Sequence, residues 1–76
     1  MGCFMKWNVY DARDFGNAVR ERRKELGYTQ TEIAQVSGVG TMFVSQLERG
    51  KPTIELDKAL HVAAMLGLDM RLKTRK

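Results

Sequence analysis

Apolar residues recur at spacings of three and four in the first third of the chain, a pattern that places them on one face of an α-helix. The residues of this face are Phe15, Val19, Arg22 or Arg23, and Leu26. Asp11 precedes the pattern as a candidate N-cap, and Gly27 follows it as a candidate left-handed C-cap. The pattern therefore predicts a first helix that starts after Asp11 and ends near Leu26.

Two shorter helices are predicted after Gly27. Thr29 and Glu32 have the spacing of a capping box, in which each side chain binds the backbone N–H of the other residue. The helix that they begin should end at Ser37-Gly38 after about two turns. Gly40 is then the N-cap of a third helix over residues 41–48, which Arg49-Gly50 should end.

The last third of the chain predicts a fourth helix and a strand. Thr53 is the expected N-cap of a helix from about residue 54 to 66, which Gly67 ends. Its predicted buried stripe is Leu56, Ala59, Leu60, Ala63 and Leu66. Residues 68–73 then alternate strictly between apolar and polar, which is the pattern of a strand. The predicted helices offer this strand no partner, so it is either a frayed tail or a strand that pairs across a dimer.

Size and composition favour a single small domain that is stabilised by association. The chain has 76 residues, with one cysteine, one histidine and a formal charge of +4. A domain of this size is marginally stable alone, and one cysteine cannot form an intrachain disulfide. A lone histidine offers no metal cluster, so we expect no metal and no cofactor. The positive charge is a weak indication of a polyanionic partner.

Other function classes are disfavoured by what the sequence lacks. It has no glycine-rich phosphate loop and no cysteine–histidine pair, so we expect that the protein is not an enzyme. It has no apolar run near the roughly 20 residues of a membrane span. We therefore expect a cytoplasmic protein that is not associated with a membrane.

Residues 29–50, two short helices joined by a tight glycine-containing turn, have the pattern of a helix-turn-helix. In this motif the second helix enters the major groove of DNA, which is about 12 Å wide. The predicted base-contacting residues are Thr41, Met42, Ser45 and Gln46. Met42 can contact a thymine methyl group, and the other three can form hydrogen bonds. The alternatives are an ordinary exposed face, or packing of Met42 in the core.

Residues around this predicted helix are candidates for the DNA backbone. The start of the second helix can bind a phosphate through its N–H groups. The predicted phosphate contacts are Thr29, Gln30, Phe43, Arg49 and Lys51. Gln30 could instead be an ordinary surface residue of the first turn. Phe43 either covers a sugar–phosphate stretch or packs sideways against the second helix.

The sequence from Phe15 to Leu68 resembles the Cro/C1-type (XRE) repressor domain. The resemblance depends on residues 20–30 (Arg-Glu-Arg-Arg-Lys-Glu-Leu-Gly-Tyr-Thr-Gln), on Ile33-Ala34 and Gly38-Val39, and on residues 44–50 (Val-Ser-Gln-Leu-Glu-Arg-Gly). It implies an all-α, four-helix, lambda-repressor-like domain that binds DNA. It also implies a partly buried ion pair between Arg23 and Glu48.

This chain departs from the family pattern at the start of the third helix. Gly40 stands where the family often has serine or threonine, and Met42 and Phe43 stand where it often has polar residues.

The end of the chain is similar to HipB-like antitoxins, through Pro-Thr-Ile-Glu-Leu at residues 52–56 and through residues 66–72. In that subgroup the final strand pairs with its copy in a second subunit, which implies a dimer strand with Leu68, Met70 and Leu72. The expected organisation is an N-terminal extension (1–10, poorly ordered or a short strand), a DNA-binding domain (11–67), a dimerisation strand (68–73) and a charged tail (74–76).

The expected function is a homodimeric transcriptional repressor that binds palindromic double-stranded operators. The resemblance also implies a bacterial protein that is associated with the nucleoid in the cytoplasm. It could also be the antitoxin of a toxin–antitoxin pair. The alternative function is a protein-interaction antitoxin that mainly binds a HipA-like kinase toxin and binds DNA weakly.

Overall fold

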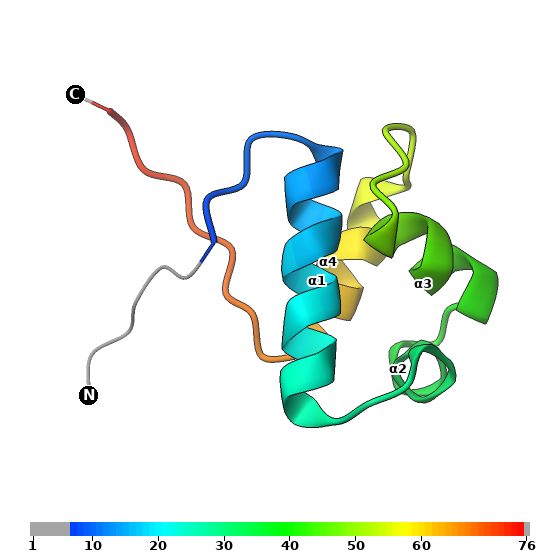
Figure 1. The fold of residues 1–76 in the computed structure, drawn as a ribbon. Helices are drawn as coiled ribbons and strands as arrows, with labels where there is room; N and C mark the ends of the chain where they lie inside the picture. The colour runs from blue at the N-terminus through cyan, green and yellow to red at the C-terminus, as the bar shows by residue number, and fades with distance from the viewer. Residues whose placement is uncertain (1–6, 76) are drawn as a thin grey trace.

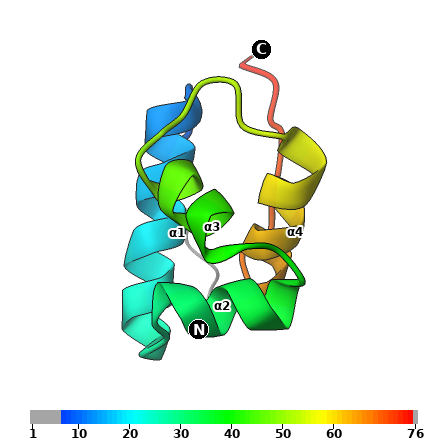
Figure 2. The ribbon, with the colours of Figure 1, turned by 90° about the vertical axis from the view of Figure 1, so that its right-hand side faces the viewer.

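The computed structural model describes residues 7–75, and its regular structure is entirely helical (Figure 1). The helices are α1 (Ala12–Leu26), α2 (Gln30–Ser37), α3 (Thr41–Glu48) and α4 (Leu56–Met65). In Figure 2, α3 lies between α1 and α4 at the front, and α2 runs across the bottom. The predicted all-α fold with four helices is confirmed. The N-terminal residues 1–6 and Lys76, which belong to the predicted extension and tail, lie outside the described residues.

The ends of the first three helices were predicted correctly because local hydrogen bonds determine them. The Oδ1 of Asp11 accepts from the N–H of Asp14 at 2.8 Å at the start of α1. The Oγ1 of Thr29 accepts from the N–H of Glu32 at 3.1 Å, and the Oε1 of Glu32 accepts from the N–H of Thr29 at 2.8 Å, which completes the capping box of α2. Gly27, after α1, has the left-handed backbone conformation that its C-cap role requires.

The core lies where the four helices meet. Its buried residues are Phe15, Val19, Ile33, Ala34, Val44, Leu47, Ala59, Val62, Ala63 and Leu66. Leu60 of the predicted stripe is half-buried against this core. Two other residues of the predicted apolar faces are exposed, since Leu26 is 43% exposed and Leu56 is 62% exposed. Both occupy terminal turns, where the periodic face continues beyond the helices that cover it. Helical spacing therefore did not predict which residues of these faces are buried.

The fourth helix starts two residues later than predicted, at Leu56 with Glu55 as its N-cap. The N–H of Ile54 donates to the carbonyl oxygen of Lys51 at 3.2 Å and closes a turn over Pro52 and Thr53. The prediction that Thr53 caps the helix was therefore wrong, because Thr53 belongs to this turn.

Helices α1 and α3 approach each other backbone to backbone at Gly16. A Cβ atom added to this buried residue would overlap the carbonyl oxygen of Leu47 and lie 3.0 Å from that of Glu48. Glycine inside a helix is intrinsically destabilising relative to alanine, so its presence here has a packing reason. The helical pattern did not predict this role, although a glycine inside it was a signal for close packing.

The described terminal segments, residues 7–11 and 67–75, lie together on the side of α1 that faces away from α3 (Figure 1). Trp7 Nε1 donates to Glu21 Oε1 at 2.8 Å, and the N–H of Leu68 donates to the carbonyl oxygen of Ala63 at 3.0 Å. Leu68 is half-buried against the core. Residues 68–75 are extended but form no strand within this single chain. Because a strand needs a neighbouring strand to bind, pairing across a dimer stays a prediction.

Within residues 7–75, no helix combines the length and the apolar character that crossing a membrane requires.

Candidate nucleic-acid interface

Helices α2 and α3 form a tightly joined pair. Gly38, which follows α2, has a φ of 72°, and the N–H of Val39 donates to the carbonyl oxygen of Ala34 at 3.0 Å. Ile33 of α2 and Val44 of α3 are fully buried in the common core. The turn and the shared core therefore hold the two helices in one orientation, as the sequence analysis expected for a helix-turn-helix.

The outward side of α3 carries the four predicted base-contacting residues. Met42 is 66% exposed and Thr41 is exposed, while Ser45 and Gln46 are half-buried. Within α3 itself there is no lysine or arginine. Lys51 lies beside this surface, where its Nζ donates to Gln46 Oε1 at 3.4 Å. The outward side therefore presents a polar surface with one flexible apolar side chain, while Val44, Leu47 and Glu48 point inward.

Four of the five predicted phosphate-contacting residues, all except Gln30, differ in their exposure and in the contacts that they already make. Arg49 and Lys51 are both exposed immediately after α3, and Lys51 also donates to Gln46 as described above. Thr29 uses its Oγ1 as the cap acceptor for α2. Phe43 is half-buried and packs against the core. Of its two predicted positions, Phe43 therefore occupies the packed one.

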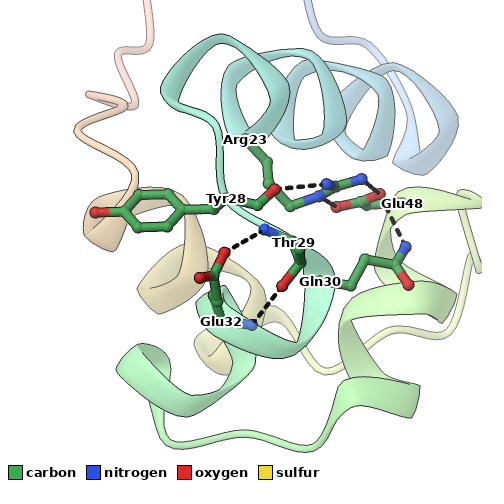
Figure 3. A network of polar contacts seen from close by, with 6 residues as sticks. All are labelled: Arg23, Tyr28, Thr29, Gln30, Glu32 and Glu48. Carbon is green, nitrogen blue, oxygen red and sulfur yellow. Dashed lines mark hydrogen bonds and ion pairs between the residues drawn. The ribbon is translucent and has the colours of Figure 1, made fainter.

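A buried ion pair joins α1 to the end of α3 (Figure 3). Arg23 Nε donates to Glu48 Oε2 at 2.6 Å, and Arg23 Nη2 donates to Glu48 Oε1 at 3.0 Å. The two side chains are only 10% and 3% exposed, respectively. The hydrogen bond to Glu48 raises the pKa of Arg23 above its ordinary value, and burial opposes this rise.

The same ion pair reaches the start of α2. Arg23 Nη1 donates to the carbonyl oxygen of Tyr28 at 2.8 Å, just before the N-cap of α2. Gln30 Nε2 donates to Glu48 Oε1 at 3.1 Å (Figure 3). Periodicity and spacing could not predict this contact, because 18 residues separate Gln30 from Glu48.

Among the described residues, no group of three or more His, Cys, Asp or Glu side chains could hold a metal ion.

A family model described as helix-turn-helix (HTH_3) matches residues 19–72, which is more than half of the chain. The chain belongs to the helix-turn-helix family. An HTH-type transcriptional regulator of Sinorhizobium fredii, y4mF, is 48% identical over 54 residues, which cover 71% of each chain. A second HTH-type transcriptional regulator, from Methanothermobacter thermautotrophicus, is 43% identical over 49 residues. These relatives identify the protein as a regulator of the Cro/C1 (XRE) type, as the sequence resemblance implied.

Solved structures of HipB share the fold of this helix-turn-helix protein. The HipB–O4 20mer complex matches with a TM-score of 0.83 and 26% identity, over 96% of this chain and 100% of that one. The HipA–HipB–O2–O3 complex matches with a TM-score of 0.84, at the same identity and over the same shares. The likeness covers nearly the whole chain, so it extends beyond the residues 19–72 that the family model matches.

Proposed function

We propose that this protein is a transcriptional repressor that binds a palindromic operator as a homodimer, with α3 in the major groove. The observation that supports this proposal concerns the residues on the outward side of α3. Thr41, Met42, Ser45 and Gln46 lie on the second helix of a helix-turn-helix that the core holds in place. Residues 11–67 serve as the DNA-binding domain, and residues 68–73 serve as the dimerisation segment.

The start of α2 is the proposed contact for a phosphate of the DNA backbone. The capping box uses the N–H groups of Thr29 and Glu32, so those of Gln30 and Thr31 are outside it. The positive end of the helix dipole favours an anion here. Gln30 adds its side-chain amide, and Arg49 and Lys51 are the proposed contacts for a flanking phosphate. Phe43 is not proposed as a contact, because it packs against the core.

Selection from a randomised duplex library, followed by mobility-shift titration, tests this function. Affinity for the selected duplex should fall steeply as salt rises, because phosphate contacts release counterions. Replacing Thr41 and Gln46 together with alanine should weaken binding to the selected duplex by about 10- to 1000-fold, with little change on random DNA. Gln35→Ala, at an exposed position of α2, is the control. Binding that ignores both salt and sequence would rule out this role.

The surface around the terminal segments supports the homodimer. Large apolar side chains are exposed around the groove between these segments and the start of α4. They are Val9, Tyr10, Leu56, Met70 and Leu72. A dimer would cover these side chains, and it would pair the extended residues 68–73 with their copies. Two α3 helices could then enter successive major grooves about 34 Å apart.

Leu72→Glu should convert the dimer to monomer without unfolding it. Leu72 is fully exposed in the single chain, so the substitution removes no contact of the monomer. In a paired strand, the carboxylate would be buried without a partner and should weaken dimerisation at least about tenfold. Analytical ultracentrifugation measures the change, and Val36→Glu, on the exposed side of α2, is the control. A dimer that tolerates Leu72→Glu would place the interface elsewhere.

A truncation that tests the same interface should begin after Leu68. Leu68 packs against the core of its own chain, so its removal would destabilise the monomer as well as the dimer.

A second candidate function is that of an antitoxin that holds a HipA-like kinase toxin. The observation that favours it is the likeness to the HipA–HipB–O2–O3 complex over nearly the whole chain. If the product of an adjacent kinase-like gene binds this protein on co-expression, the Thr41 and Gln46 double variant should still bind that product. If the double variant loses both DNA binding and binding of the kinase-like product, the two partners do not use separate surfaces.

A further inference from the structure

The last residue of α3 binds the first residue of α2 as well as α1. Glu48 Oε1 accepts from Gln30 Nε2 and from Arg23 Nη2, while Glu48 Oε2 accepts from Arg23 Nε. The ion pair with Arg23 already joins α3 to α1. The contact with Gln30 is an additional one, and it places the inward-facing Glu48 next to a residue that the proposed function assigns to the DNA backbone.

We infer that Glu48 is a positioning residue for DNA binding, which holds the side-chain amide of Gln30 in the orientation that binds a phosphate. This inference depends on the proposed phosphate contact at the start of α2. Glu48 itself does not touch DNA, since its side chain is only 3% exposed. It acts through Gln30, which is half-buried and so is held by the protein on one side and open to solvent on the other.

The chemistry of the two groups determines which way the amide faces. An ionised carboxylate only accepts hydrogen bonds, so the nitrogen of the Gln30 amide, and not its oxygen, must face Glu48. The amide nitrogen carries two N–H groups in one plane. When Glu48 takes one of them, the direction of the second is set, and this second N–H is the donor available to a phosphate. Without Glu48, the amide could rotate and present its oxygen, which a phosphate repels.

Arg23 makes this arrangement compatible with DNA. A carboxylate that shares a donor with a phosphate would repel the DNA strand if its charge were uncompensated. The two hydrogen bonds from Arg23 to Glu48 are charge-assisted, and they lie in a site that is nearly closed to water. The guanidinium therefore compensates the negative charge of Glu48 while leaving Oε1 able to accept from Gln30. The three residues form one unit, in which α1 supplies the charge, α3 the acceptor and α2 the donor (Figure 3).

A double-mutant cycle on DNA affinity tests the inference. The probe is the duplex selected from the randomised library, and the variants are Gln30→Ala, Glu48→Gln and the two combined. Glu48→Gln keeps the size of the side chain but leaves one acceptor oxygen where Arg23 and Gln30 used two. Each single variant should weaken binding by about 2- to 10-fold, the range of one net hydrogen bond. The combined variant should bind no more weakly than Gln30→Ala alone, because Glu48 acts only through Gln30.

Two measurements separate positioning from a purely structural role. Affinities are compared at a temperature where circular dichroism shows that every variant is folded, with Gln35→Ala as the matched glutamine control. In the DNA-free protein, NMR should show one Gln30 side-chain amide proton protected from exchange, and Glu48→Gln should remove this protection. If Glu48→Gln weakens binding by the same factor with and without Gln30, the inference is wrong, although the proposed function stands. If the folded wild-type protein binds no duplex, the proposed function itself fails.

Discussion

Replacing Glu48 with alanine should lower the free energy of unfolding by about 3–5 kcal/mol. The substitution leaves the Arg23 guanidinium in a site where its side chain is only 10% exposed and has lost both hydrogen bonds to a carboxylate. The full range applies because water has little access to compensate the charge. A domain of 76 residues has little stability to lose, so a large part of this variant should be unfolded at room temperature. Urea titration followed by circular dichroism measures the loss.

Two further variants show whether the buried charge of Arg23 causes the predicted loss of stability in Glu48→Ala. Glu55→Ala removes a pair with Lys58 in which both side chains are more than half exposed, and it should cost less than about 1 kcal/mol. Replacing Arg23 with methionine and Glu48 with leucine together should recover part of the stability, because no charge is then left buried. Equal losses for Glu48→Ala and Glu55→Ala would contradict this account.

Gly16→Ala should lower the free energy of unfolding by about 1–3 kcal/mol, although alanine is favoured over glycine by about 1 kcal/mol in a helix interior. The added methyl group would overlap the carbonyl oxygen of Leu47, and it would crowd that of Glu48. Both are backbone atoms, which cannot rotate away as a side chain can, so α1 and α3 must separate. Thermal unfolding measures the effect.

The matched control is Gly40→Ala, where the added methyl group has no atom within 4 Å and the φ of −79° suits any residue. It should cost only what a poorer N-cap costs, about 1 kcal/mol or less. If Gly16→Ala is as stable as the wild type, the close approach of α1 and α3 does not require glycine.

Features that depend on neighbouring residues were predictable from the sequence. The capping box of Thr29 and Glu32, the N-cap at Asp11 and the C-cap at Gly27 each involve residues within one or two turns of one another. The start of α4 was the exception, because a local turn that closes between Lys51 and Ile54 competed with the predicted cap. Leu26 and Leu56, at the ends of the predicted apolar faces, are exposed for another reason. Burial of a side chain depends on a second helix that covers it.

At the candidate site, too, the features that neighbouring residues determine were predictable, and those that depend on packing were not. The pattern of residues 29–50 was sufficient to predict α2, the glycine turn and α3, and the family resemblance also implied the Arg23–Glu48 pair. The contact of Gln30 with Glu48 was not predictable from the pattern, because two separate helices must be packed before the two side chains meet. The same holds for Phe43, whose packing decided between two positions that the sequence left open.

The sequence by itself therefore determined the four helices, the caps of the first three and the family, because hydrogen bonds within a few residues and one amphipathic period encode them. Only the tertiary structure decided how closely α1 approaches α3 at Gly16, and which acceptor holds the amide of Gln30. It also decided that Leu68 is half-buried against the core while Leu72 is exposed. The physical reason is that each of these depends on atoms far apart in the chain, whose distances are set only when the helices pack together.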